Sequence, residues 1–187
     1  WGIDTNIFIF PISFLVLVGI SNSVNLSDGL DGLTAGCSAI IFYGLGTEIL
    51  IKEQPQLIVF SILCYSMSGI CLGFLKYNCY PAKIFMGDTG SLSIGAIMGS
   101  IALLTNSLFT LCIFSGLFII ESLSVIIQVG FFKITKILSH NGKRIFLMAP
   151  LHHHFELKGV KETKIVENFW KINILLVILG IVLKINL

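Results

Sequence analysis

Apolar positions along the chain gather into long runs separated by short polar segments. Six of these runs approach the roughly 20 apolar residues that a membrane-spanning helix needs. They cover residues 7–23, 33–51, 57–75, 92–104, 108–132 and 169–187. The fourth run is short and borrows flanking residues, whereas the fifth is long enough to be tilted or broken. The pattern predicts an all-α, polytopic integral membrane protein of about six transmembrane helices, with residues 1–187 forming a single membrane domain.

The composition supports the same interpretation. Of the 187 residues, 55% are hydrophobic and only 12% are charged, and the mean hydropathy is +0.94. Soluble domains contain about 25% charged residues, and a small domain buries only about two-thirds of its unfolded surface. The composition therefore excludes a soluble enzyme, a disordered chain and a small secreted domain held by disulfides.

The distribution of basic residues predicts how the chain is oriented. Eight of the twelve Lys and Arg residues lie between Lys133 and Lys171. A basic segment between spans marks the cytoplasmic side of a membrane protein. Counting back through the spans places the polar loops 22–32 and 76–91 on that same side. Three polar loops on one face are typical of a membrane enzyme with a cytoplasmic substrate, whereas transporters place polar residues near the bilayer midplane.

The first loop repeats an amide or a carboxylate at every third residue. The repeat consists of Asn22, Asn25, Asp28 and Asp31. An α-helix would spread these side chains over half its surface, whereas a 3₁₀-like or looped segment would align them. The adjacent Gly29 and Gly32 would let the backbone approach a ligand. The alternative is that Asp28 or Asp31 caps the helix that begins at Leu33.

The second loop places a carboxylate among glycines at the start of an apolar helix. Asp88 either caps this helix or binds Mg²⁺, a cation that prefers carboxylate oxygens and substrate phosphates. Gly87 and Gly90 would expose backbone N–H groups to a phosphate at the helix start. Phe85 either faces lipid or stacks on a base beside the acidic site.

The third loop contains the consecutive histidines His152, His153 and His154. On a helix these side chains point about 100° apart, which is poor geometry for zinc. We therefore favour a role in anion binding or proton transfer beside a diphosphate.

The segments 22–32, 78–91 and 150–156 closely resemble the signature loops of the polyprenyl-phosphate N-acetylhexosamine-1-phosphate transferases. Within that group they are most similar to the phospho-N-acetylmuramoyl-pentapeptide-transferase family. The resemblance implies transfer of phospho-MurNAc-pentapeptide from UDP-MurNAc-pentapeptide to undecaprenyl phosphate, which yields lipid I and UMP. It further implies Mg²⁺ as cofactor, the bacterial inner membrane as location, an active site facing the cytoplasm and a homodimer. No nucleic acid partner is expected.

The resemblance also assigns roles to individual residues. Asp88 matches the Mg²⁺-binding catalytic aspartate, and we expect Asp28 to assist it at the metal. Asn25 and Asp28 match catalytic residues at the sugar and diphosphate. Substrate-binding positions on the uracil and nucleotide side are matched by Gly29, Leu30, Asp31, Asn78, Phe85 and Gly87. The histidine motif of the family is matched by His152, His153 and His154, which we count among the catalytic residues.

One family feature has no counterpart in this sequence. The family carries an Asp-Asp pair in a more N-terminal loop, after about four earlier spans, and no Asp-Asp dipeptide occurs here. We therefore expect this chain to correspond to the C-terminal part of a transferase with about ten spans, and to be inactive alone. Two alternatives stay open, namely a transferase that uses UDP-GlcNAc and a transporter that uses Glu121 as an intramembrane carboxylate.

Overall fold

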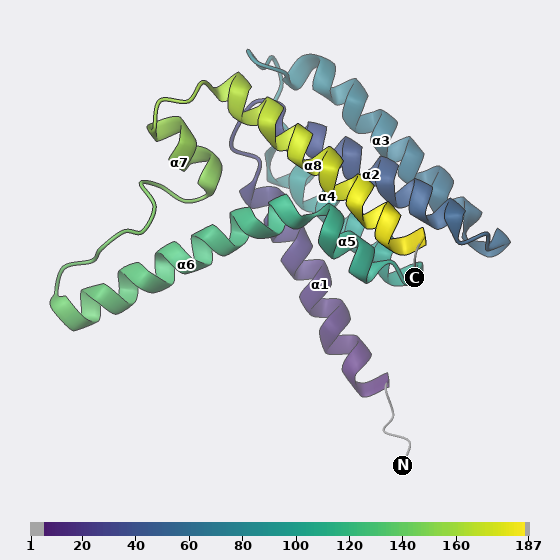
Figure 1. Ribbon diagram of the computed structural model, residues 1–187, viewed down its shortest axis with the longest axis horizontal. Helices are drawn as coiled ribbons and strands as arrows, with labels where there is room; N and C mark the ends of the chain where they lie inside the picture. Colours follow the sequence, from purple (N-terminus) through teal and green to yellow (C-terminus); the bar gives the residue numbers. More distant parts are fainter. Residues whose placement is uncertain (1–5, 186–187) are drawn as a thin grey trace.

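The computed structural model describes the backbone of residues 6–185 and the side chains of residues 11–138 and 140–184. All regular elements in this part of the chain are helices, which confirms the predicted all-α class (Figure 1). They are α1 (Asn6–Leu26), α2 (Leu33–Ile51), the 3₁₀ turn η1 (Pro55–Leu57), α3 (Ile58–Asn78), α4 (Gly87–Leu104), α5 (Leu108–Phe114), α6 (Gly116–Ser139), α7 (Leu151–Leu157) and α8 (Glu162–Ile185).

Five of the described helices are long and apolar enough to cross a membrane, namely α2, α3 with η1, α4, α6 and α8. This confirms a polytopic membrane protein. The first predicted span corresponds to α1, of which Pro11–Leu26 forms a shorter apolar helix. The fifth predicted span is broken between α5 and α6. Ser115 lies at the break, where its backbone N–H and its hydroxyl both donate to the carbonyl of Leu111, and such back-bonding bends helices.

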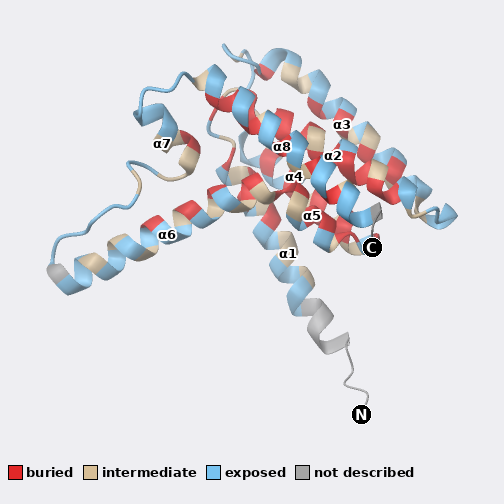
Figure 2. Cartoon of the chain, in the orientation of Figure 1, coloured by how far each residue is buried: buried red, intermediate tan, exposed pale blue. Residues whose placement is uncertain are grey.

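Helix α2 forms the centre of the bundle (Figure 2). Its small residues explain how neighbouring helices pack so closely against it. A Cβ atom on Gly36 would collide with the indole of Trp170 in α8, and one on Gly44 would collide with Val177. Small residues at helix interfaces are the usual means of close packing in membranes, where the hydrophobic effect cannot drive helices together. The outward faces of the surrounding helices are apolar and exposed, as expected for contact with lipid.

Helix α6 leaves the bundle and carries the chain away from α2 (Figure 1). The segment after it returns along the same helix toward α7. Gln128 of α6 holds this segment, because its side-chain oxygen accepts hydrogen bonds from the backbone N–H groups of Ile145 and Phe146, both at 3.0 Å. The segment between α6 and α7 thereby brings the histidines of α7 back to the bundle.

A buried polar cluster ties the helices together where α2 ends. The ammonium group of Lys52 lies 3.0 Å from the carboxylate of Glu48 and donates to the carbonyl of Thr105 at 2.6 Å. Ser107 donates to the other carboxylate oxygen of Glu48 at 2.7 Å. Each charged group of the cluster is therefore paired within the protein, as burial requires.

Helices α1 and α4 approach each other closely at Gly95. A Cβ atom at this position would lie 2.6 Å from the Cα atom of Ser21 and 2.9 Å from the carbonyl oxygen of Ile20. Nearby, the hydroxyl of Ser21 donates to the carbonyl of Leu92 at 2.8 Å. The contact fixes the end of α1 beside the start of α4.

We predict that Gly95→Ala destabilises the protein by about 1–3 kcal/mol, because backbone atoms that cannot rotate away oppose the new methyl group. Thermal unfolding in detergent would measure the loss. Gly73→Ala is the matched control, since Gly73 is an exposed helical glycine with open space around its Cβ position, and we expect a change within about 0.5 kcal/mol. Equal unfolding temperatures for the two variants would contradict the close α1–α4 contact.

Candidate active site

The first and second polar loops meet at the end of the bundle where α2 begins. The side-chain amide of Asn25 donates to Oδ1 of Asp88 at 2.9 Å. The backbone N–H of Gly32 donates to Oδ1 of Asn78 at 3.1 Å, and that of Ala82 donates to Oδ2 of Asp31 at 2.8 Å. The two loops, which lie far apart in the sequence, therefore form one continuous surface. This agrees with the prediction that both loops lie on the same side of the membrane.

A cavity of about 270 Å³ opens between these two loops. Its lining consists of Asn25, Asp28, Gly29, Leu30, Asp31, Asn78, Phe85, Met86, Gly87 and Asp88. Every predicted site residue outside the histidine motif belongs to this lining. Sequence reasoning missed Met86, although it stands between Phe85 and Gly87 in the motif.

The backbone conformation of the first loop explains why its polar residues share the cavity. The N–H groups of Ser27 and Asp28 bond to the carbonyl three residues earlier in each case, in the 3₁₀ manner. This spacing aligns Asn25 with Asp28 and Asp31, as predicted. Asn22 does not belong to the cavity lining, and its side-chain amide donates instead to the carbonyl of Val18, one turn earlier in α1.

The aspartates do not act as helix caps. Gly32 occupies the position before α2, with a positive φ of 78°, and no side chain caps this helix. Asp88 lies in the first turn of α4 and likewise makes no capping bond. The capping alternative for both loops is therefore wrong, and the carboxylates of Asp28 and Asp88 are left facing the cavity.

The charged form of Asp28 is disfavoured at this site. The pKa of Asp28 lies above its ordinary value, mainly because burial disfavours the charged form. The hydroxyl of Thr34 opposes this rise, whereas the nearby charge of Asp88 adds to it. A divalent cation bound at this carboxylate would favour its charged form.

The donor set fits Mg²⁺ better than a metal enclosed by protein ligands. Within the part of the chain that the structure describes, no three His, Cys, Asp or Glu side chains gather as a metal cluster. Mg²⁺ is usually held by one or two carboxylates together with water and substrate phosphates. Asp28 and Asp88 could supply those carboxylates.

The third loop reaches the first loop at Gly29. A Cβ atom on Gly29 would lie 2.3 Å from Nε2 of His152 and 3.1 Å from Nε2 of His153. Glycine is therefore needed at this position because an imidazole ring of the same chain occupies the space that a Cβ atom would fill. His154 points elsewhere, since its Nδ1 accepts the backbone N–H of Leu147 at 3.1 Å. Two of the three histidines therefore lie against Gly29, although neither belongs to the cavity lining.

Phe85 and Asn78 have different surroundings within the cavity. The side chain of Phe85 is 77% exposed, so its ring is free to stack on a planar ligand. Asn78 is buried, and its amide donates to the carbonyl of Ile84 while its oxygen accepts from Gly32. Asn78 thus joins the two loops through backbone contacts and shapes the cavity wall.

Three further side chains contact the site that sequence reasoning had not assigned to it. The hydroxyl of Ser91 accepts a second hydrogen bond from Asn25 at 2.9 Å. Glu162, at the start of α8, accepts the backbone N–H of Asp31 at 2.7 Å. Glu121 of α6 contacts His152 at 3.2 Å. Two of them carried a signal in the sequence, Glu121 as a carboxylate within an apolar run and Ser91 as a hydroxyl in the 78–91 motif.

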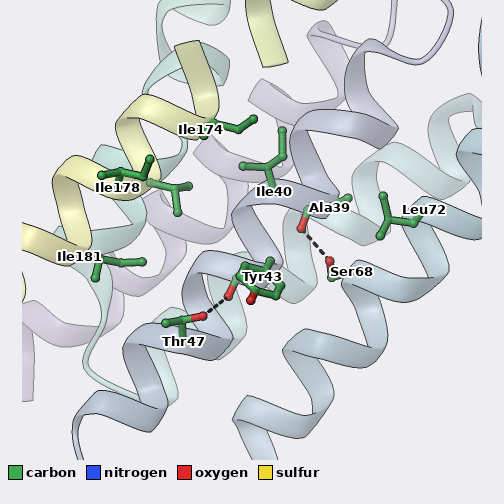
Figure 3. Close-up of a pocket in the computed structure, with 10 residues that line it drawn as sticks. Ala39, Ile40, Tyr43, Thr47, Ser68, Leu72, Ile174, Ile178 and Ile181 are labelled. Carbon is green, nitrogen blue, oxygen red and sulfur yellow. Dashed lines mark hydrogen bonds between the residues drawn. The ribbon is translucent and has the colours of Figure 1, made fainter. Parts of the chain in front are cut away.

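A second cavity of about 400 Å³ lies between α2, α3 and α8 (Figure 3). Isoleucines of α8 and residues of α2 and α3 line it, without any charged side chain. The hydroxyls of Ser68 and Thr47 donate to the carbonyls of Ala39 and Tyr43, respectively. Because this cavity has no charged side chain, it is a poorer candidate for binding a phosphate or a metal than the cavity between the loops.

Comparisons with known proteins agree with the resemblance of the three loops. Phospho-N-acetylmuramoyl-pentapeptide-transferases of Prochlorococcus marinus strains MIT 9312 and MIT 9515 are 88% and 72% identical over all 187 residues. The transferase of that name from Thermodesulfovibrio yellowstonii is 47% identical over 97% of the chain. In each case the match covers 52% of the relative, so the chain spans about half the length of the curated relatives it matches.

A family model gives a broader assignment that does not depend on any single relative. The model for glycosyl transferase family 4 matches residues 2–106, which is more than half of the chain. This segment contains the first two polar loops and all ten residues that line the cavity between them. The chain therefore belongs to glycosyl transferase family 4.

Proposed function

We propose that this chain forms part of an enzyme that transfers phospho-MurNAc-pentapeptide from UDP-MurNAc-pentapeptide to undecaprenyl phosphate. The products are lipid I and UMP. The observation that carries the proposal is the hydrogen bond between Asn25 and Asp88 at the cavity, because it unites two loops whose motifs are those of this transferase family. The names of the relatives support the same substrates.

The cavity has the groups that phosphoryl transfer demands. Such reactions depend mainly on positioning and on neutralising charge. Mg²⁺ held by Asp88 and Asp28 would neutralise the diphosphate of the nucleotide. Asn25 orients Asp88 through its amide, and the exposed ring of Phe85 would stack on uracil. Gly29, Leu30 and Asp31 would complete the nucleotide side of the cavity.

The position of the cavity suits one soluble and one lipid substrate. The site lies at the ends of apolar helices, so undecaprenyl phosphate would approach from the bilayer while the sugar nucleotide enters from water. The basic segment between Lys133 and Lys171 favours the cytoplasm for that aqueous side. We propose in addition that the protein acts as a homodimer in the bacterial inner membrane.

The proposed reaction is best tested in a hybrid transferase. This hybrid is the relative from strain MIT 9312, with residues 1–187 of this chain replacing the segment they match. We expect the hybrid to release UMP from UDP-MurNAc-pentapeptide when undecaprenyl phosphate and Mg²⁺ are supplied. Release from UDP-GlcNAc in its place would support the alternative transferase, and release from neither would overturn the proposal.

In the hybrid, Asp88→Asn should abolish UMP release at saturating Mg²⁺, because the neutral amide cannot replace a carboxylate at the cation. The variant should still fold, since asparagine keeps the shape of the side chain. Glu167→Gln provides the control, because Glu167 is an exposed carboxylate of α8 that does not belong to the cavity lining. Turnover close to that of the unmodified hybrid would show that Asp88 does not bind the metal.

Phe85→Ala should weaken binding of UDP-sugar by roughly tenfold to a hundredfold. Stacking of a base on an aromatic side chain is worth about 1–3 kcal/mol, which corresponds to this range. Phe109→Ala, another exposed aromatic residue but distant from the cavity lining, is the control. Titration with uridine nucleotides would reveal the change, and an unaltered affinity would indicate that Phe85 faces lipid.

We further expect the 187-residue chain on its own to release no UMP. It contains no Asp-Asp dipeptide, the feature that the family carries at its lipid phosphate, and its relatives are about twice as long. An assay of the purified chain in detergent, with the hybrid as positive control, would test this. Sustained turnover by the chain alone would show that the pair is dispensable.

A further inference from the structure

Glu121 and His152 form a buried pair beside the candidate active site. Glu121 is 1% exposed and His152 is fully buried. Oε2 of Glu121 lies 3.2 Å from Nδ1 of His152 and also accepts the backbone N–H of the same residue at 3.4 Å. The carboxylate thus contacts both the ring and the backbone of His152, and it joins α6 to α7.

The pair determines which nitrogen of the imidazole carries the proton. A carboxylate only accepts hydrogen bonds, so it favours the tautomer with the proton on Nδ1. Nε2 then bears a lone pair. In the structure Nε2 is buried, has no hydrogen-bond partner and faces Gly29, the residue next to Asp28. A buried acceptor without a partner is costly, and this one points toward the loop that lines the cavity.

His153 repeats the arrangement in a more exposed setting. Its Nδ1 lies 3.0 Å from the carboxylate of Glu156, and its Nε2 also faces Gly29. The side chains of this second pair are 26% and 48% exposed, so water weakens their interaction. The buried Glu121–His152 pair is therefore the stronger constraint on ring orientation.

We propose that Glu121 is a positioning residue, which holds His152 in one ring orientation with its Nε2 packed against Gly29, and so fixes the loop that carries Asp28 in the cavity wall. The assignment rests on the proposed transferase function. This role differs from ion coupling in a transporter, because the carboxylate of Glu121 contacts a histidine of the same protein.

Two substitutions of Glu121 distinguish a positioning role from a requirement for its negative charge. Glu121→Leu removes the acceptor, whereas Glu121→Gln removes the charge but retains an oxygen that can accept from Nδ1. Glu48→Gln is the matched control, because Glu48 is also a buried carboxylate but is paired with Lys52, far along α2 from the site. All variants are made in the hybrid transferase, and thermal unfolding identifies those that fold.

The tautomer of His152 provides a readout that does not depend on activity. Solid-state NMR of ¹⁵N-histidine-labelled hybrid in lipid bilayers, assigned with His152→Gln, should show the proton on Nδ1 in the unmodified protein. We expect the same tautomer in Glu121→Gln and Glu48→Gln, and its loss in Glu121→Leu. A folded Glu121→Leu variant with an unchanged tautomer would overturn the proposal.

Kinetics of UMP release provides the second readout. Loss of the orienting carboxylate beside a functional histidine is known to lower turnover strongly, so kcat for Glu121→Leu should fall about tenfold or more. Its KM for the UDP-sugar should change by less than about threefold, and Glu121→Gln should recover most of kcat. If Glu121→Gln keeps the tautomer but is as slow as Glu121→Leu, charge rather than position matters and the proposal is wrong.

The two readouts also distinguish this inference from the proposed function. An unmodified hybrid that shows the Nδ1 tautomer and its dependence on residue 121, but releases no UMP, would contradict the transferase while leaving the pairing intact. An active hybrid in which His152 does not depend on residue 121 would contradict the positioning role alone. If Glu121→Leu does not fold, the tautomer in Glu121→Asp decides, because the shorter side chain should lose the contact with Nδ1.

Discussion

The core of a bilayer offers no hydrogen-bond partners, so polar groups of this chain must find partners within the protein. The arrangement of the helices follows from this constraint. Hydroxyls of α3, such as those of Ser61 and Ser68, donate to backbone carbonyls of α2. Glu48 and Lys52 pair with each other and with groups near the end of α4. The polar residues that remain gather in the loops, where water and substrates can reach them.

Close packing of the helices determines where the residues of the candidate active site lie. Lipid is as apolar as the helix surfaces, so helices associate through shape and small residues. The contact of α4 with the backbone of α1 at Gly95 fixes the axial position of both helices. Asp88 lies about two turns before Gly95 on α4. Asn25 lies about one turn after Ser21 on α1. The 2.9 Å contact between the side chains of Asn25 and Asp88 thus depends on packing inside the membrane.

Local sequence information predicted the helices, and the resemblance to the transferase family supplied most of the residues that line the cavity. Apolar runs mark helices wherever they lie, and the three-residue spacing of Asn25, Asp28 and Asp31 indicated a shared direction. The length of the fifth run allowed for a break, but its position at Ser115 and the turning of α6 away from the bundle could not be predicted, since an apolar run carries no information about direction. The contact of His152 with Gly29 was equally hidden, because it joins residues more than 120 positions apart.

Two buried polar atoms beside the candidate active site have no hydrogen-bond partner in the described part of the chain. They are Nε2 of His152 and Oε1 of Glu121. Near the end of α2, Oε1 of Glu48 also lacks a hydrogen bond, but it lies 3.0 Å from the ammonium group of Lys52. Natural proteins rarely leave buried polar groups unpaired without a functional reason. The end of the bundle that carries the cavity therefore keeps unpaired acceptor groups of Glu121 and His152 beside the Gly29 loop at a cost in stability, as expected where a site serves function.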